Sequence, residues 1–151
     1  MSIVRTLVRA GAQKVVTMPD DGDLLQAVRA FLGVRSASRG CADGGCGACR
    51  VLLDGELVKT CRIKIADVRD GAVVEAYEDL ESDPAAVRAI AAFDTERPTR
   101  CSLCVGGVGV TAVALSRAGR AGRPAAVDDL VEEANCVCTG RGSLRRALLA
   151  K

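Results

Sequence analysis

The 151-residue sequence contains no histidine and no tryptophan, and its only aromatic residues are Phe31, Tyr77 and Phe93. The absence of histidine excludes Rieske-type iron–sulfur ligation, haem held through histidine and catalytic Cys–His pairs. Few aromatic side chains are present to stack on bases, and the net charge is only +2, so nucleic-acid binding has little support. The sequence also lacks an apolar run long enough to span a bilayer.

Cysteine, in contrast, is abundant, with eight in the chain. Disulfides would account for them only in an oxidising compartment. Residues 1–9 interleave charged and apolar side chains, so they lack the continuous apolar segment of a secretory signal. We therefore expect a cytoplasmic protein whose thiols stay reduced and bind a metal or a cluster.

The first four cysteines follow the spacing C-x4-C-x2-C and, after eleven further residues, C: they are Cys41, Cys46, Cys49 and Cys61. Plant-type ferredoxins hold a 2Fe–2S cluster with this arrangement. Glycine reaches positive φ and lets the backbone approach a bare inorganic core, which suits Gly40, Gly44, Gly45 and Gly47. Zinc sites prefer two CxxC knuckles or paired Cys and His, which this loop does not offer. The spacing thus favours a 2Fe–2S cluster over zinc or free thiols.

The pattern of residues 1–76 predicts a small mixed sheet that carries one helix, the β-grasp layout. The expected elements are a hairpin of residues 3–9 and 13–18, a helix from an acidic cap near residue 23 to Gly33, a second hairpin of residues 50–53 and 56–59 turning at Asp54-Gly55, and a strand at 72–76. Residues 77–83 are expected to be a linker.

The second half of the chain changes character and predicts an all-helical domain over residues 84–151. The expected helices are 84–93 with Asp83 as its cap, 102–118, 126–135 and 143–149. Gly107 to Ala112 matches the loose G-x-G-x-x-G/A dinucleotide fingerprint, but no strand precedes it and a cysteine-bearing turn does. We therefore interpret these glycines as permitting close helix packing.

The helical half carries a second cysteine set, a CxxC pair and a CxC pair: Cys101, Cys104, Cys136 and Cys138. Antiparallel helices would bring the two pairs together, and helix N-termini stabilise an anionic cluster through their free amides. The alternatives are two buried structural cysteine pairs or a zinc site, for which a CxC pair is strained. A thioredoxin-like redox pair is disfavoured because no βαβ pattern surrounds the CxxC.

Charge is unevenly distributed along the chain, with an acidic stretch at 77–96 and a basic one at 97–151. Solvated faces explain most of these charges. The arginines near cysteines stay candidates for a binding role: Arg100, Arg141, Arg145 and Arg146.

With both cysteine sets in view, the chain closely resembles the small iron–sulfur subunit of the molybdenum hydroxylases, the xanthine oxidase family. The order of the eight cysteines, the hairpin at 51–55 and the Thr139-Gly140 pair after the last cysteine carry the resemblance. It implies an α+β protein with an N-terminal β-grasp plant-type ferredoxin domain and an all-α four-helix-bundle domain. Each domain would hold one 2Fe–2S cluster.

The resemblance also implies roles for individual residues. Cys41, Cys46, Cys49 and Cys61 would bind the outer cluster, and Cys101, Cys104, Cys136 and Cys138 the cluster nearest molybdenum. Cys138 would also lie beside the pterin amino group. A separate large subunit would hold molybdopterin as its cytosine dinucleotide, and often a third subunit holds FAD.

The sequence departs from the family in three places. Arg100 stands where a glutamine usually contacts the pterin, Val105-Gly106-Gly107 replaces the usual Thr-Pro-Gly, and Val137 and Arg141 replace an arginine and a tyrosine. Our hypothesis is that Arg100 replaces an amide hydrogen bond with a charged one, at the pterin or its phosphate.

The expected function is that of an electron-transfer subunit of a cytoplasmic oxidoreductase, with the substrate site in a partner chain and no nucleophile or general base in this one. Electrons would pass from molybdenum through the two clusters to FAD or an external acceptor. The alternatives are a free-standing ferredoxin-type carrier, which leaves the helical domain unexplained, and a zinc-stabilised interaction module.

Overall fold

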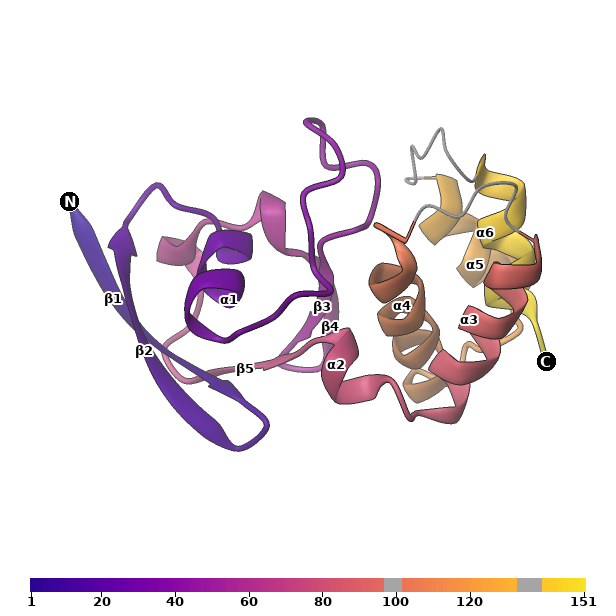
Figure 1. The fold of residues 1–151 in the computed structure, drawn as a ribbon, viewed down its shortest axis with the longest axis horizontal. Helices are drawn as coiled ribbons and strands as arrows, with labels where there is room; N and C mark the ends of the chain where they lie inside the picture. The colour runs from indigo at the N-terminus through magenta and orange to yellow at the C-terminus, as the bar shows by residue number, and fades with distance from the viewer. Residues whose placement is uncertain (97–101, 133–139) are drawn as a thin grey trace.

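The computed structural model of the chain describes residues 1–96, 102–132 and 140–151. Figure 1 shows a sheet-containing N-terminal part beside a helical C-terminal part, with the two termini at opposite ends of the molecule. The predicted α+β class is confirmed. The assignment of the two parts as separate domains with a boundary at 77–83 stays a prediction.

The N-terminal part is a five-stranded mixed sheet in the order β2-β1-β5-β3-β4. Its strands are β1 (Ser2–Arg9), β2 (Ala12–Pro19), β3 (Arg50–Leu53), β4 (Glu56–Lys59) and β5 (Ala72–Glu75). β1 pairs with β5 in parallel, and the other neighbours are antiparallel. Both predicted hairpins are present, and the second turns at Asp54 and Gly55 with φ values of 50° and 86°. Positive φ at both turn residues matches the right-handed twist of the strands.

One α-helix, α1 (Leu24–Phe31), packs on this sheet. The side chain of Asp23 caps it by accepting a hydrogen bond from the Gln26 amide at 2.9 Å, and Gly33 follows its end with φ of 66°. The apolar face of α1 and the inner face of the sheet share one core, which includes Leu7, Val16, Leu24, Val28, Val51 and Val74. Two 3-10 turns, Thr60–Arg62 and Ile65–Asp67, connect β4 to β5.

The C-terminal part contains the helices α3 (Pro84–Glu96), α4 (Val105–Arg117), α5 (Pro124–Glu132) and α6 (Gly140–Leu149). The predicted cap of the first is confirmed, because the Asp83 carboxylate accepts a hydrogen bond from the Ala85 amide at 2.9 Å. Phe93 is fully buried in the core of this part. A one-turn helix that the sequence did not predict, α2 (Tyr77–Leu80), lies within the expected linker.

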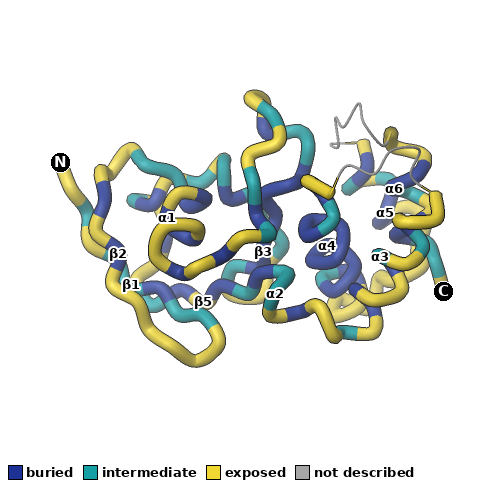
Figure 2. The backbone as a smooth tube through the Cα atoms, viewed as in Figure 1, coloured by how far each residue is buried: buried dark blue, intermediate teal, exposed yellow. Residues whose placement is uncertain are grey.

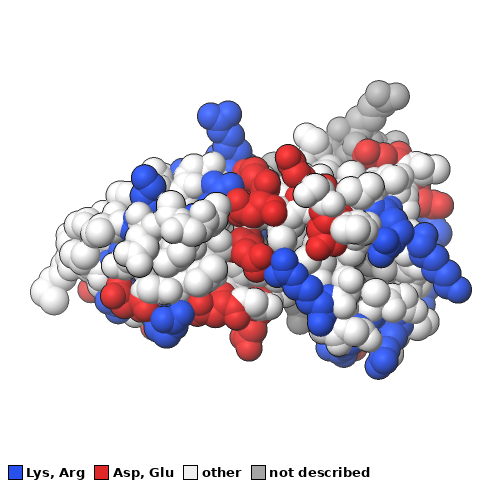
Figure 3. Space-filling view, turned by 90° about the horizontal axis from the view of Figure 1, so that it is seen from below, with Lys and Arg blue, Asp and Glu red and all other residues white. Residues whose placement is uncertain are grey.

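The two parts are packed against each other and are not joined by the chain alone. Ala48 and Leu52 of the N-terminal part belong to the same buried cluster as the helices, and Figure 2 shows much of both β3 and α4 as buried. Arg117 of α4 pairs with Glu75 of β5 at 2.8 Å on the surface. Figure 3 shows acidic side chains gathered near the middle of one face, with basic ones to either side. The position of α4 against β3 therefore determines how the two cysteine-bearing regions meet.

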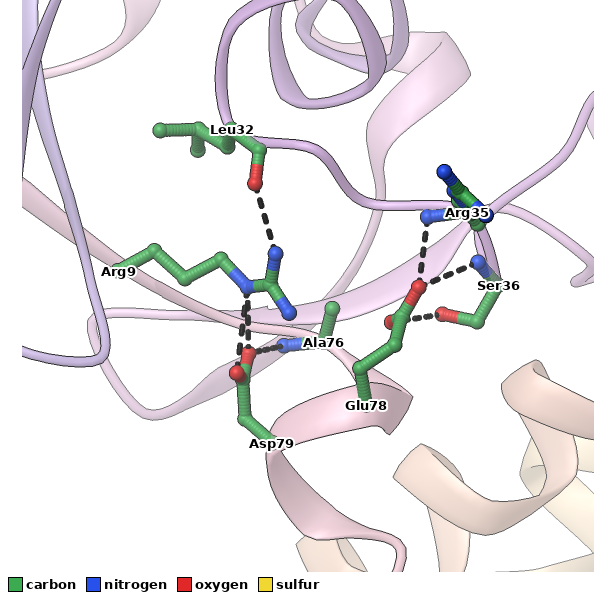
Figure 4. A network of polar contacts seen from close by, with 7 residues as sticks. All are labelled: Arg9, Leu32, Arg35, Ser36, Ala76, Glu78 and Asp79. Atoms are coloured by element: carbon green, nitrogen blue, oxygen red, sulfur yellow. Dashed lines mark hydrogen bonds and ion pairs between the residues drawn. The ribbon is translucent and has the colours of Figure 1, made fainter.

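Two acidic residues of α2 hold the segment that leads into the first cysteine loop (Figure 4). The Glu78 carboxylate accepts hydrogen bonds from the Arg35 amide at 2.6 Å, the Ser36 amide at 2.8 Å and the Ser36 hydroxyl at 2.6 Å. Asp79 pairs with Arg9, whose guanidinium also donates to the Leu32 carbonyl at 2.7 Å. These contacts fix residues 32–36 relative to the sheet.

A Glu78→Gln substitution is expected to destabilise the protein in a pH-dependent way. Burial works to raise the pKa of Glu78, but the hydrogen bonds from Ser36 and Arg35 outweigh it and hold this pKa below its ordinary value of 4.5. The carboxylate therefore stabilises the fold above pH 4.5, and this contribution is lost as the pH falls through the lower folded-state pKa. We expect a loss of about 1–2 kcal/mol in unfolding free energy at pH 7.

Urea unfolding measured from neutral pH to about pH 3 checks this expectation, because the difference from wild type should shrink in the acid range. Glu81→Gln is the matched control, since Glu81 is an exposed carboxylate at the end of the same helix. Equal losses in the two variants, or a Glu78→Gln loss independent of pH, would contradict the role given to Glu78.

Candidate iron–sulfur sites

The loop between α1 and β3 presents three of the four N-terminal cysteines, and it stands at the top of Figure 1. Cys41 and Cys46 are partly exposed, whereas Cys49 is buried at 2% exposure just before β3. Cys61 comes from the 3-10 turn after β4. The sheet therefore delivers the fourth cysteine from a separate segment, as the spacing predicts.

These four thiols form two close pairs, and none is in a disulfide. The Sγ atoms of Cys49 and Cys61 are 3.3 Å apart. The Cys46 amide donates to the Cys41 Sγ at 3.3 Å, and the Ala48 amide donates to the Cys46 Sγ at 3.4 Å. The loop thus turns backbone amides toward its sulfurs, an arrangement that stabilises negative charge on them.

Glycines allow the loop to close around the thiols. Gly44 and Gly47 have φ values of 77° and 72°, as predicted for a chain that must wrap tightly. A Cβ at Gly40 would lie 2.8 Å from the Cys46 Sγ, so a side chain there would collide with the sulfur. The Gly45 amide donates to the Asp43 carboxylate at 2.9 Å within the same turn.

Two of these thiols, Cys46 and Cys61, resist ionisation as long as no cation balances them. Burial and the neighbouring Cys49 thiol raise the pKa of Cys61 to about 11, although the Arg39 charge opposes the shift. Burial also raises the pKa of Cys46, against the hydrogen bond from Ala48 and with the effect of Cys41. A bound cation reverses this preference, because metal coordination replaces the thiol protons.

The thiols of the first set lie in a pairwise arrangement. In the described part of the chain, no group of three or more candidate ligand side chains converges on one point. Zinc needs four donors around one ion, whereas a 2Fe–2S cluster distributes four thiolates over two irons. The two thiol pairs, Cys41 with Cys46 and Cys49 with Cys61, match that distribution.

Of the second cysteine set, the structure describes Cys104. It is the N-terminal cap residue of α4 and is buried at 9% exposure. Cys101, Cys136 and Cys138 lie outside the described residues, as does Arg100, so their predicted roles stay predictions.

The two cysteine-bearing regions are in contact. Leu103 lies against the first loop, because a Cβ at Gly40 would be 3.0 Å from its Cδ2 atom. Cys104 and Ala48 belong to the same buried cluster, and Cys46 packs against that cluster. The predicted reason for the glycines of α4 is also confirmed: a Cβ at Gly107 would be 2.2 Å from the Gly47 carbonyl oxygen, and one at Gly109 would be 2.6 Å from the Tyr77 ring.

Two of the arginines singled out by their sequence positions form ordinary ion pairs. Arg145 pairs with Asp128, and Arg146 pairs with Glu96 at 2.6 Å.

A more unusual arginine is Arg50, which sequence reasoning missed. Arg50 follows Cys49 directly and is buried at 5% exposure. The only signal was a charged residue at the start of an otherwise apolar strand, Arg50–Leu53.

Comparisons with known proteins agree with this geometry. The family described as 2Fe-2S iron-sulfur cluster binding domain matches residues 8–86. The nicotine 6-hydroxylase small subunit of Paenarthrobacter nicotinovorans is 33% identical over 110 residues, which span 73% of this chain and 66% of that protein. A probable xanthine dehydrogenase subunit of Bacillus subtilis is 30% identical over 149 residues, spanning 95% of this chain and 81% of that protein.

A solved structure extends the likeness to the fold. The aldehyde oxidoreductase from Desulfovibrio desulfuricans superposes with a TM-score of 0.80 at 28% identity, covering 97% of this chain and 16% of that one. The chain therefore belongs to the 2Fe–2S iron–sulfur cluster-binding family. Within that family it is a 2Fe–2S subunit of the molybdenum hydroxylase group of oxidoreductases. No helix in the described part of the chain combines the length and apolar character that a bilayer crossing needs.

Proposed function

We propose that the chain is the electron-transfer small subunit of a molybdenum-containing hydroxylase or dehydrogenase. It would relay electrons from a molybdopterin site in a large partner subunit, through two 2Fe–2S clusters, to FAD or an external acceptor. The substrate site would lie in that partner, and a third, FAD-binding subunit would complete the complex where one is present. The names of the relatives, a hydroxylase small subunit and a dehydrogenase subunit, support this assignment.

The proposed ligands are the two cysteine sets. Cys41, Cys46, Cys49 and Cys61 would hold one cluster in a β-grasp domain of residues 1–76, and Cys101, Cys104, Cys136 and Cys138 the other in a helical domain of residues 84–151. A bound 2Fe–2S cluster supplies a one-electron carrier. The chain's own part is to hold the irons with thiolates and to direct the amides of Cys46 and Ala48 at the sulfurs.

Arg100 and Cys138 would face the molybdopterin cytosine dinucleotide of the large subunit, through a charged hydrogen bond and through the pterin amino group respectively. The use of all eight cysteines as thiolate ligands requires a reducing compartment, so we place the complex in the cytoplasm.

The observation that carries the proposal is the contact between the two cysteine-bearing regions. Leu103 of the CxxC segment touches the loop at Gly40, and Cys104 shares a packed cluster with Ala48. Electron transfer through protein weakens steeply with distance, so a relay needs its two centres held close and rigid. A free-standing carrier with one cluster has no use for this arrangement.

Metal analysis and electron paramagnetic resonance of the native protein test the proposal. We expect about four irons and four acid-labile sulfides per chain, with two distinct paramagnetic centres on full reduction. The protein should also co-purify with a larger, molybdenum-containing chain. A single centre in an isolated small protein would favour a ferredoxin-type carrier, and zinc without iron would favour an interaction module. Either result would overturn the proposal.

A further inference from the structure

Arg50 places a positive charge in the interior, between the first cysteine loop and the helices. Arginine is seldom buried to 5% exposure unless its guanidinium has specific partners. Here its Nη1 donates to the Thr111 hydroxyl of α4 at 3.1 Å, and its Nη2 donates to the Leu130 carbonyl of α5 at 3.3 Å. The planar fork of the guanidinium thereby fixes the charge against two helices at once.

The same guanidinium lies directly against the cysteine loop. A Cβ at Gly47, the residue after Cys46, would be 3.2 Å from the guanidinium carbon of Arg50. Gly107 of α4 packs on the carbonyl of Gly47 from another direction, and the Thr111 hydroxyl donates to the Gly107 carbonyl at 2.6 Å. Gly47 is therefore held between the Arg50 charge and α4.

We propose that the buried charge of Arg50 raises the reduction potential of the centre held by Cys41, Cys46, Cys49 and Cys61. The inference rests on the proposed function, because it requires a cluster at those residues. One-electron reduction adds a negative charge to the cluster, and a fixed cation beside the loop stabilises the reduced form. The guanidinium keeps its proton throughout, so only an electron moves in this couple. Because the cation is buried, added salt does not screen it as it screens a surface charge.

The test is a redox titration of the Arg50→Met and Arg50→Gln variants in the holoprotein, followed by electron paramagnetic resonance. Methionine has a similar length without charge and fills the buried site. We expect the equilibrium constant for reduction of the centre held by the first cysteine set to fall about tenfold or more. For a one-electron couple, a tenfold fall lowers the potential by about 59 mV. The other centre should change less than threefold, and both shifts should be the same at low and high salt.

Arg62→Gln is the matched control for the charge. Arg62 also lies against the loop, since a Cβ at Gly44 would be 2.6 Å from its Cδ, but its side chain is exposed. Removing the Arg62 charge should change the reduction potential of this centre less than removing the Arg50 charge does. The change caused by Arg62→Gln should vanish at about 1 M salt. Thr111→Val is the control for packing, because it removes a hydrogen-bond partner and keeps the charge. It should lower the melting temperature and leave both potentials within twofold.

Iron-loaded Arg50→Met and Arg50→Gln proteins with both potentials within twofold of wild type would overturn the inference and leave the proposed function standing. Should neither variant take up iron, Arg50→Lys decides. The inference then requires the wild-type potential to be kept within twofold, despite lower stability, and a tenfold change would overturn it. A wild-type protein free of iron and acid-labile sulfide would overturn the proposed function and this inference together.

Discussion

Replacing Cys61 by serine is expected to remove one of the two proposed iron–sulfur centres and to leave the other in place. The iron content should fall from about four to about two atoms per chain, with a matching loss of acid-labile sulfide. The reason is the pairing in the structure, where the Cys61 and Cys49 sulfurs are 3.3 Å apart and would share one iron. Serine keeps the size of the side chain but replaces a soft thiolate by a hard hydroxyl oxygen, a poor ligand for this cluster.

Cys61 is the better choice for this experiment than Cys49. Cys49 is 2% exposed within the sheet core, so its replacement also disturbs packing, whereas Cys61 is partly exposed on a 3-10 turn. Iron analysis, acid-labile sulfide and the paramagnetic spectrum of the reduced protein measure the outcome. Circular dichroism confirms that the fold is retained.

Cys104→Ser provides the complementary control, because it removes a proposed ligand of the helical centre. The two variants should lose different paramagnetic signals, which assigns each signal to one cysteine set. That assignment also identifies the centre whose potential Arg50 is proposed to raise. A Cys61→Ser protein that kept both signals at full iron content would show that Cys61 is not a ligand.

Much of the fold follows from short-range chemistry that can be read along the chain. The Asp54-Gly55 turn needs two residues that tolerate positive φ, and the pair predicts a hairpin without any knowledge of the rest. Asp83 before Pro84 is a local signal for the start of a helix, and its carboxylate does accept a hydrogen bond from the Ala85 amide. The spacing of the first cysteine set is also local, which is why the loop could be anticipated in detail.

The features that escaped prediction depend on residues far apart in sequence. Arg50 is buried only because α4 and α5, which lie 55 or more residues further along, supply its acceptors Thr111 and Leu130. No residue near Arg50 in the sequence indicates that Thr111 and Leu130 will be its partners. The one-turn helix α2 is too short to show helical periodicity, and it forms where Asp79 accepts a hydrogen bond from the Ala76 amide.

The same limit applies to Arg145 and Arg146. Proximity to a cysteine in sequence suggested a binding role, but these side chains point to carboxylates of neighbouring helices, Asp128 and Glu96. Their ion pairs are partly exposed and contribute little to stability. Arg145 and Arg146 are therefore better described as charged residues on solvated helix faces than as binding residues.

The second large effect is expected from Gly107→Ala, which should destabilise the protein although it removes a glycine from a helix. In a helix interior, glycine to alanine normally stabilises by about 0.5–1 kcal/mol. At Gly107 the added Cβ would lie 2.2 Å from the carbonyl oxygen of Gly47, and both groups belong to the backbone. Neither can rotate away, so α4 must separate from the cysteine loop. We expect a net loss of about 3 kcal/mol or more in unfolding free energy.

Two other helical glycines make the comparison quantitative. A Cβ at Gly109 would be 2.6 Å from the Tyr77 ring, a side chain that can shift, so Gly109→Ala should cost less than Gly107→Ala. A Cβ at Gly142 of α6 would be 3.3 Å from the flexible end of Arg146, so Gly142→Ala should be neutral or stabilising. Thermal and urea unfolding of the three iron-loaded variants give this order directly.

The order of stability among these three variants also shows whether the contact of α4 with the cysteine loop or intrinsic helix propensity governs these positions. If helix propensity governed these positions, all three substitutions would raise stability, with Gly107→Ala no worse than Gly142→Ala. If the contact of α4 with the loop governs them, Gly107→Ala should further broaden or shift the paramagnetic signal of the N-terminal centre, because Gly47 lies next to Cys46 in the loop. A stable Gly107→Ala protein with an unchanged signal would mean that α4 does not rest on the cysteine loop, and the close approach that we propose for the two centres would lose its structural basis.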